Sequence, residues 1–105
     1  MAFVVRPYRR FPVAFPVTYE HGWREGRGIV WNVSPTGWRI SGNLPLRRGD
    51  VCSLKMVLPT NKQLSVAAGI VRWVRGGEFG IETLVMDGKA QASIGTYIRQ
   101  RMKEL

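Results

Sequence analysis

Apolar and polar residues alternate along most of this chain, as they do in β-strands that bury one face. In the first such segment Val13, Phe15, Val17 and Tyr19 share one face, and the residues between them point the opposite way. Comparable segments follow at about Arg27–Ser34, Trp38–Ser41, Cys52–Leu58, Leu64–Arg75 and Phe79–Met86. The pattern therefore predicts six short β-strands.

Two residues predict irregularities in these strands. Pro16 has no backbone N–H, which indicates a sheet edge or a β-bulge in the first strand. The apolar positions of the fifth strand change phase near Gly69, as a β-bulge requires. Glycine, proline and asparagine gather between the strands and predict turns at His21–Gly22, Pro35–Gly37, Gly42–Asp50, Pro59–Lys62 and Gly76–Glu78.

The last segment changes its period. Ile94, Tyr97 or Ile98, and Met102 recur at helical spacing, and Asp87 is a suitable N-cap in front of them. We therefore expect a mainly β fold, a six-stranded antiparallel barrel with a C-terminal α-helix from about residue 88. The 105 residues are enough for one domain, with residues 1–11 as an N-terminal arm and 12–105 as the barrel and helix.

The composition is basic. Lys and Arg number 16 against 7 Asp and Glu, a formal charge of +9, and twelve of the 16 are arginines. This charge favours an anionic partner, and guanidinium groups suit phosphates and purine edges in particular. Cys52 is the sole cysteine, which excludes an intrachain disulfide or a cysteine zinc cluster and fits the cytoplasm. The apolar runs are too short to predict a membrane span.

Catalytic residues are not evident. His21 is the one histidine and is predicted to be a turn residue. The carboxylates are scattered, with no metal-ligand spacing and no pairing of a nucleophile with a base. We expect neither an enzyme nor a metal site.

A polar stretch, Asn32-Val33-Ser34-Pro35-Thr36-Gly37, ends the second predicted strand. Asn32 and Ser34 are two residues apart, so on a strand they share one face and are expected to point outward. Ile29, Trp31 and Val33 are then expected to point inward. The alternative to a binding role is an ordinary turn in which Asn and Ser hydrogen-bond to their own backbone.

The N-terminal arm carries Arg6 before Pro7, and Arg9 and Arg10 between Pro7 and the first strand. Prolines push their neighbours toward extended conformations, so this segment is predicted to be extended. Arginines near a terminus are usually solvated, which is the alternative to a binding role.

Together the two polar segments resemble the RxxxR and (D/N)xSxxG motifs of PilZ domains, bacterial receptors for cyclic di-GMP. Arg6-x-x-x-Arg10 matches the first motif, and Asn32-x-Ser34-x-x-Gly37 matches the second. The similarity continues through residues 10–17 and through Gly69-Ile70-Val71-Arg72-Trp73-Val74 to Phe79-Gly80-Ile81-Glu82. The resemblance covers most of the chain and implies the PilZ-type barrel.

The resemblance also implies roles for single residues. Arg6 and Arg10 are expected to bind guanine edges and phosphates, with Arg9 as the substitute. Asn32 and Ser34 are expected to line the opposite wall, where Asn32 replaces the frequent aspartate and gives up charge-assisted bonds.

Gly37 ends the second motif, and Trp38 follows it directly. Gly37 would supply a positive φ or a close backbone approach. Trp38 is interpreted either as a core residue or as a ring that stacks on a base.

The implied function is a stand-alone cyclic di-GMP receptor with no further cofactor. Ligand binding would change its conformation, and the altered surface would engage an effector protein. One alternative is a PilZ-like adaptor that acts by protein contact without ligand. The other is a small basic barrel that binds nucleic acid. Against the latter, all four tryptophans, Trp23, Trp31, Trp38 and Trp73, are expected to pack in the core.

Overall fold

The structure is a computed structural model that describes residues 11–86 and 88–103. The arm arginines Arg6, Arg9 and Arg10 and the N-cap candidate Asp87 lie outside the described residues. The elements in chain order are β1 (Phe11–His21), β2 (Arg24–Val33), β3 (Gly37–Gly42), β4 (Val51–Val57), β5 (Gln63–Arg75), β6 (Glu78–Met86) and α1 (Gly88–Lys103).

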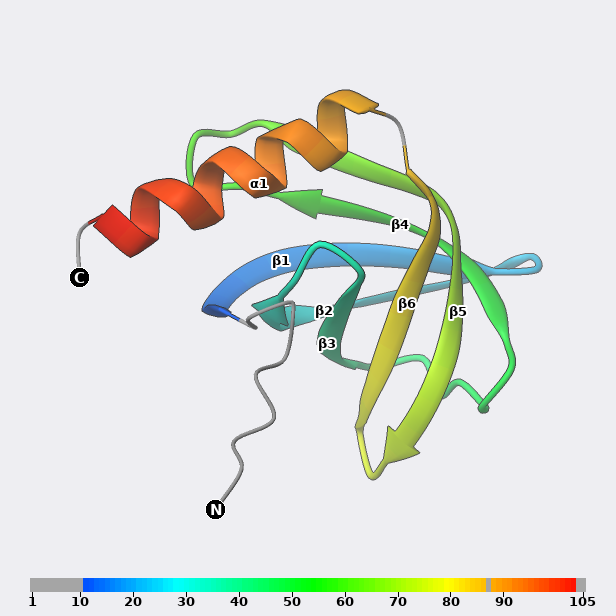
Figure 1. Cartoon of the computed structure of the whole chain (residues 1–105). Coiled ribbons are helices and arrows are strands. Elements are labelled where there is room, and N and C mark those ends of the chain that lie inside the picture. Colours follow the sequence, from blue (N-terminus) through cyan, green and yellow to red (C-terminus); the bar gives the residue numbers. More distant parts are fainter. Residues whose placement is uncertain (1–10, 87, 104–105) are drawn as a thin grey trace, which may run out of the picture.

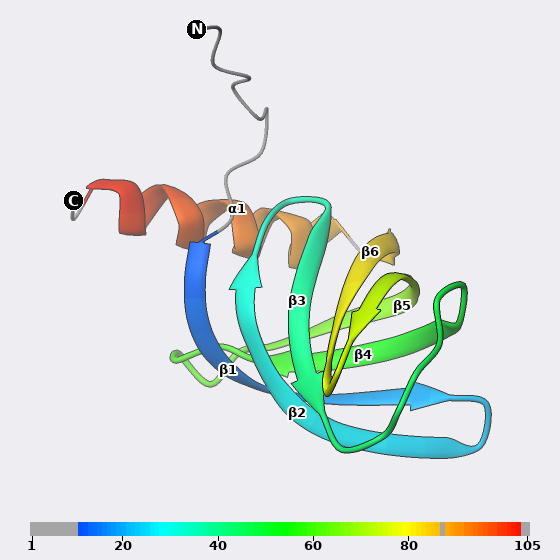
Figure 2. The same ribbon diagram turned by 90° about the horizontal axis from the view of Figure 1, so that it is seen from below.

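The six strands form a closed barrel in the order β1-β2-β3-β6-β5-β4. All neighbouring strands are antiparallel, as short turns between consecutive strands favour. Figures 1 and 2 show the strongly curved strands closing around one interior, with α1 beside the barrel. The predicted six-stranded antiparallel barrel with a C-terminal helix is confirmed.

The core follows from the alternation in the sequence. Phe15, Val17 and Tyr19 of β1 are buried, and so is the matching face of β4, Cys52, Leu54 and Met56. The other buried apolar residues include Val30, Val33, Ile40, Leu44, Leu46, Leu64, Val66, Val71, Phe79 and Ile81. Burial of these side chains stabilises the barrel by about 1.5–3 kcal/mol for each large side chain.

Tyr19 fixes the loop between β3 and β4 to the barrel. Its hydroxyl donates to the carbonyl of Leu44 at 2.8 Å and accepts from the N–H of Leu44 at 3.0 Å. Its ring meets Phe79 edge-to-face with centroids 5.2 Å apart. Burial raises the pKa of Tyr19 above its ordinary value, because the phenolate would be poorly solvated there.

The predicted phase change of β5 is present, whereas the bulge of β1 lies before Pro16, which pairs with Ile29 of β2 and stands just outside the β1–β4 ladder that begins at Val17. The pairing of β1 with β2 shifts between Pro12 and Phe15. The register of β5 shifts near Gly69 in its pairing with each neighbouring strand, β6 and β4. A Cβ at Gly69 would lie 2.6 Å from the side chain of Ile81, so glycine is required there by close packing.

A further bulge, which the alternation did not predict, lies in β2. Val30 pairs with Ile40 and Asn32 with Arg39, so two steps along β2 match one step along β3. The extra residue is Trp31, which is 38% exposed. The expected inward face Ile29, Trp31 and Val33 is therefore wrong for Trp31, because the bulge makes Val30 and Val33 the buried pair.

The helix α1 flanks the barrel through its apolar face. Ala90, Ile94 and Ile98 are buried at helical spacing, as the period of the sequence predicted. Tyr97 meets Phe15 of β1 edge-to-face with ring centroids 5.4 Å apart. These contacts attach α1 to the end of the barrel where β1 begins.

Candidate functional site

The β2–β3 turn is organised by the hydroxyl of Ser34. The Ser34 Oγ accepts from the N–H groups of Thr36 and Gly37 at 3.3 and 3.1 Å, and it donates to the carbonyl of Gly37 at 3.1 Å. The Ser34 N–H also donates to the Gly37 carbonyl at 2.9 Å. These bonds use the one donor and both acceptor positions of the hydroxyl.

Ser34 is therefore part of the turn itself. It is 5% exposed, so the expectation that its side chain points outward into solvent is wrong. The physical reason is that the chain leaves the strand at Ser34, where the turn folds its own backbone donors over the hydroxyl. The self-bonding alternative describes this residue correctly.

Gly37 begins β3 in close contact with β6. A Cβ at this position would lie 2.6 Å from the carbonyl oxygen of Ile81, nearer than a side chain can approach. The backbone of Gly37 is not in the positive-φ region. Of the two expected reasons for glycine, close backbone approach therefore applies, and the N–H of Thr83 donates to the Thr36 carbonyl at 2.9 Å beside it.

Asn32 lies between two strands at the bulge. It is half-buried and pairs with Pro12 of β1 and with Arg39 of β3. Its side-chain amide makes no hydrogen bond to residues 11–86 or 88–103. In this it differs from Ser34, two residues further on.

The first described residues of β1 lie beside the second sequence motif. Phe11, the residue that follows Arg10 in the chain, pairs with Val33, which lies between Asn32 and Ser34. Pro12 pairs with Asn32 itself. The N-terminal arm therefore joins the described structure beside the β2–β3 turn.

Trp38 belongs to the barrel core. It is 2% exposed, which agrees with the core interpretation and leaves no face on which a base could stack. Its Nε1–H has no hydrogen-bond partner among the described residues.

Two of the other tryptophans are not core residues. Trp23 is 93% exposed at the tip of the β1–β2 hairpin, and the exposed Trp31 donates from Nε1 to the Oγ of Ser41 at 2.7 Å. The expectation that all four tryptophans pack in the core is confirmed for Trp38 alone, because Trp73 is only half-buried and is not part of the core cluster. A two-residue hairpin loop leaves Trp23 no neighbour to cover it, and the bulge turns Trp31 outward.

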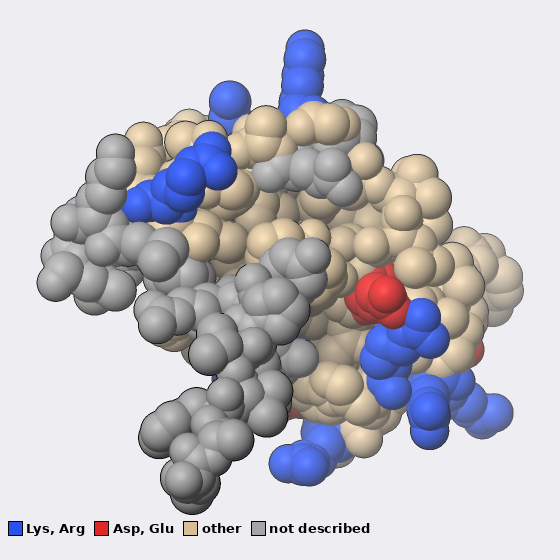
Figure 3. Space-filling model, in the orientation of Figure 1, with Lys and Arg blue, Asp and Glu red and all other residues tan. Residues whose placement is uncertain are grey.

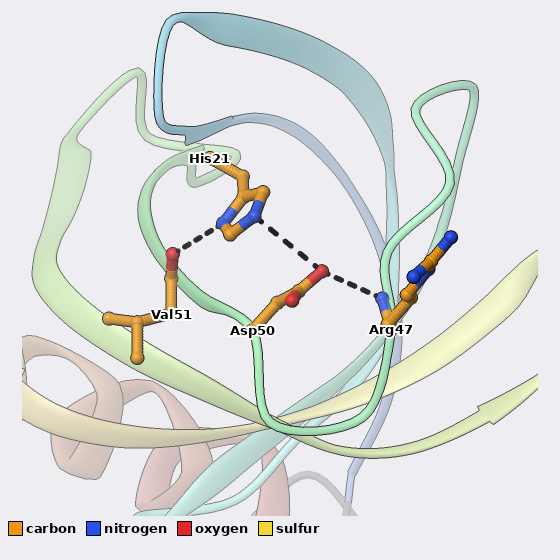
Figure 4. A network of polar contacts seen from close by, with 4 residues as sticks. All are labelled: His21, Arg47, Asp50 and Val51. Carbon is orange, nitrogen blue, oxygen red and sulfur yellow. Dashed lines mark hydrogen bonds and ion pairs between the residues drawn. The ribbon is translucent and has the colours of Figure 1, made fainter.

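His21 connects the β1–β2 hairpin to the start of β4 (Figure 4). Its Nδ1–H donates to the carbonyl of Val51 at 2.9 Å, and its Nε2 lies 3.7 Å from Asp50 Oδ2. Asp50 Oδ2 also accepts from the N–H of Arg47 at 2.8 Å. His21 thus has a structural role at the strand end, next to the predicted turn.

Basic groups outnumber acidic ones on the surface in Figure 3. Two carboxylates are paired within the sheet: Arg72 Nε donates to Glu82 Oε2 at 2.5 Å, and Arg39 Nε lies 3.7 Å from Glu78 Oε1. Over the described ranges, no three His, Cys, Asp or Glu side chains gather closely enough to bind a metal ion.

The thiol of Cys52 is buried in the barrel. Burial, and secondarily the charge of Asp50, raises the pKa of the Cys52 thiol to about 11, so it stays protonated at neutral pH.

Among the described residues, no helix is long and apolar enough to span a membrane.

Solved structures with the same fold support the topology. The "Inhibitor of motility (MotI/DgrA)" of Bacillus subtilis superposes with a TM-score of 0.81 at 19% identity, over 96% of this chain and 53% of the Bacillus protein. This chain thus spans about half the length of that protein. The PilZ domain of CeSA from a cellulose-synthesizing bacterium gives a TM-score of 0.69 at 15% identity, over 90% and 98% of the two chains.

A search of the curated proteins found no match. The sequence model of the PilZ domain, in contrast, matches residues 5–100. That range contains the three arginines of the arm, both motifs, the whole barrel and most of α1. On this match, with the barrel topology behind it, the chain belongs to the PilZ domain family.

Proposed function

We propose that this chain is a cyclic di-GMP receptor whose ligand lies between the N-terminal arm and the end of β2. The observation that carries the proposal is the register of β1 on β2, which sets Phe11 opposite Val33 and Pro12 opposite Asn32. Arg10 is covalently next to Phe11, so an extended arm can reach a ligand at Asn32. Family membership supplies the ligand class.

The ligand chemistry suits these residues. Cyclic di-GMP has two phosphates and two guanines, and the O6 and N7 acceptors of guanine suit a bidentate arginine. In this proposal Arg6 and Arg10 bind guanine edges and phosphates, and Arg9 takes over if the register of the arm shifts. Asn32 hydrogen-bonds to the ligand from the barrel side, because its amide has no partner among the described residues.

Ser34 and Gly37 have a different role in the proposal. The Ser34 hydroxyl is already saturated by its own turn, and Gly37 allows β3 to approach β6. Both residues therefore shape the wall on which the ligand rests. Trp38 is left out of the proposed site because its ring is buried.

The proposed signal is a change in the arrangement of the N-terminal arm. A ligand that bridges the arginines and Asn32 neutralises the repulsion among the three arginines and stabilises one arrangement of the arm. The surface beside β1 and β2 then changes, and a protein partner can distinguish the two states. We propose that the chain acts in this way in the cytoplasm, as a receptor or adaptor without catalytic activity of its own.

Isothermal titration calorimetry of the full chain with cyclic di-GMP tests the proposal. We expect saturable binding in the micromolar range, and cyclic di-AMP serves as the matched control because adenine has an amino donor where guanine has the O6 acceptor. Arg10→Ala is expected to lose most of the affinity. Absence of saturable binding at tens of micromolar would leave the ligand-free adaptor as the better description.

One observation favours a second candidate function, nucleic-acid binding. Trp23 is exposed at a hairpin tip next to Arg24, and a basic surface with an exposed aromatic ring suits single-stranded nucleic acid. Gel shifts with unrelated oligonucleotides separate the two candidates. Salt-sensitive retardation that Trp23→Ala abolishes would support this second function, and unretarded oligonucleotides would exclude it.

A further inference from the structure

A groove separates α1 from the turn between β4 and β5. Its volume is about 640 Å³, within the range of ligand-binding clefts. One wall is the turn, which contributes Leu58, Pro59, Thr60 and Lys62. The other wall is α1, which contributes Lys89, Ala92, Ser93, Thr96, Tyr97 and Gln100. The lining residues include neither Asn32 nor any residue of the β2–β3 turn, so the groove is distinct from the barrel wall of the proposed nucleotide site.

The shape of the groove is elongated. The lining residues of α1 recur every three or four positions from Lys89 to Gln100, so they form one stripe along the helix. At 1.5 Å per residue this stripe is about 17 Å long. An extended peptide rises about 3.3 Å per residue, so about five residues would fill that length. A peptide segment fits this shape better than a compact small molecule.

The wall opposite α1 is preformed. The N–H of Leu58 donates to the Lys62 carbonyl at 2.8 Å, and the N–H of Asn61 donates to the Leu58 carbonyl at 2.9 Å. Asn61 has a φ of 64°, a conformation that asparagine tolerates in turns. Because the turn is closed by its own hydrogen bonds, a partner would find this wall already in place.

The charge of the groove has one sign. Two of the ten lining residues, Lys62 and Lys89, are cationic, and none is acidic. Arg99 adds a third cation at the rim, where its Nη2 donates to Thr96 Oγ1 at 3.3 Å. Lys89 stands in the first turn of α1, and the positive end of the helix dipole adds to its field. The visible part of α1 in Figure 3 carries blue side chains and no red ones.

The groove also has an apolar side. Leu58, Pro59, Ala92 and Tyr97 offer carbon surface between the cations. An occupant therefore needs carboxylates that reach Lys62 and Lys89 and apolar side chains that pack between them. The chain's own N-terminal arm does not meet this requirement, because it carries Arg6, Arg9 and Arg10.

We propose that this groove binds an acidic segment of a partner protein, about five residues long, in which carboxylates alternate with apolar side chains. The inference gives the chemical class of the effector in the proposed function, and it rests on that function only for its regulatory meaning. Docking itself needs no nucleotide. The cations of the groove would supply orientation and a fast encounter, and the apolar side would supply most of the affinity.

Peptide selection against the full chain, without nucleotide, tests the proposal. A displayed library of random seven-residue peptides is selected at low salt, and one peptide with the enriched sequence is synthesised. We expect Asp and Glu to be enriched in alternation with apolar residues. In spectra of the ¹⁵N-labelled chain, that peptide should shift the amide signals of Lys62, Lys89, Ala92 and Thr96.

Charge reversal then locates the site. The double variant Lys62→Glu with Lys89→Glu should weaken binding of the same peptide at least tenfold. Lys55→Glu is the matched control, because Lys55 is an exposed lysine of β4 that does not line the groove, and it should leave the affinity within about twofold. Thermal unfolding of each variant verifies that the fold is retained. Added salt should weaken the wild-type complex.

Two results would overturn the inference: selected sequences without acidic enrichment, or acidic peptides whose signals map outside the groove. Calorimetry with cyclic di-GMP is a separate readout. A chain that binds the nucleotide but no acidic peptide refutes the groove proposal alone. A chain that binds the peptide in the groove but no nucleotide refutes the receptor proposal and leaves the groove in place.

Discussion

The β2–β3 turn and the groove beside α1 use their polar groups in opposite ways. In the turn, the Ser34 hydroxyl is buried and makes its full set of hydrogen bonds to residues 36 and 37. In the groove, Lys62 and Lys89 have no side-chain hydrogen bond or ion pair to another described residue. Polar groups in the turn hold a shape, whereas those in the groove remain available for a partner.

The attachment of the two regions differs as well. The turn is joined to the barrel by backbone ladders on β2 and β3, and Gly37 touches the backbone of β6. The helix is attached through the packing of Ala90, Ile94, Ile98 and Tyr97. Backbone ladders specify position closely, while side-chain packing permits a helix to shift by small steps. The turn is therefore suited to holding a fixed position, and the helix is suited to small shifts against the barrel.

Loss of packing under α1 should destabilise the chain most. Ile94→Ala should lower the free energy of unfolding by about 2–5 kcal/mol, because the side chain is 3% exposed and its removal leaves a cavity under the helix. Urea or thermal unfolding measures this. Gln100→Ala, on the exposed side of α1, should change stability by less than about 0.5 kcal/mol. A loss below 1 kcal/mol for Ile94→Ala would show that α1 is scarcely coupled to the barrel.

The next effect concerns the β2–β3 turn, where Gly37 lies against β6. Gly37→Ala should destabilise the fold by about 1–3 kcal/mol, since the new Cβ would meet the Ile81 carbonyl at 2.6 Å and force β3 away from β6. Gly77→Ala is the matched control, because no atom lies within 4 Å of its added Cβ. Equal melting temperatures for the two variants would contradict the close approach of β3 to β6.

Ser34 and Asn32 belong to one motif, but their substitution is expected to affect different properties. Ser34→Ala should cost about 1 kcal/mol of stability, because the N–H groups of Thr36 and Gly37 lose their acceptor. Asn32→Ala should leave stability within about 0.5 kcal/mol and weaken cyclic di-GMP binding about tenfold. Thermal unfolding and calorimetry of both variants measure the two effects. Ser65→Ala, an exposed strand position, is the control for the loss of a hydroxyl.

The smallest effect is a pH dependence from Cys52. Its pKa is raised from 9.0 to about 11 in the folded chain, so between these values the folded state holds a proton that the unfolded state has lost. Stability should therefore be unaffected below pH 8 and fall as pH rises, by about 1 kcal/mol at pH 10. Cys52→Ala should show a shallower decline, with the remainder due to groups such as Tyr19. An identical slope in both proteins would contradict the burial of the thiol.

Sequence periodicity predicted most of the fold because burial follows it closely. The strands, the bulge at Gly69 and the helix all leave a direct signal, since one face of each must be apolar. The bulge at Trp31 leaves none, because it depends on how β2 pairs with β3 and not on the residues of β2 alone. The exposure of Trp23 was also missed, since a large aromatic residue near a strand usually packs inside.

The candidate site was predicted less completely than the fold. Sequence motifs named Asn32, Ser34 and Gly37, and the structure gives each of them a different environment. Hydrogen bonds within a turn depend on its three-dimensional path, so the saturation of Ser34 could not be inferred from spacing. The groove was missed altogether, because its two walls are 27 or more positions apart in sequence at Lys62 and Lys89.

The partial pairing of β1 affects how readily a strand of another copy of this chain could add to it. Among the described strands, β1 pairs with β4 only from Val17 to Glu20, so Phe11–Pro16 has a strand neighbour on the β2 side alone. An exposed strand edge is a template on which another chain can add a strand and begin to aggregate. Pro12 and Pro16 both lie in this stretch and offer no N–H to such a strand. The two prolines therefore reduce the number of N–H donors that an added strand could use along this stretch of β1.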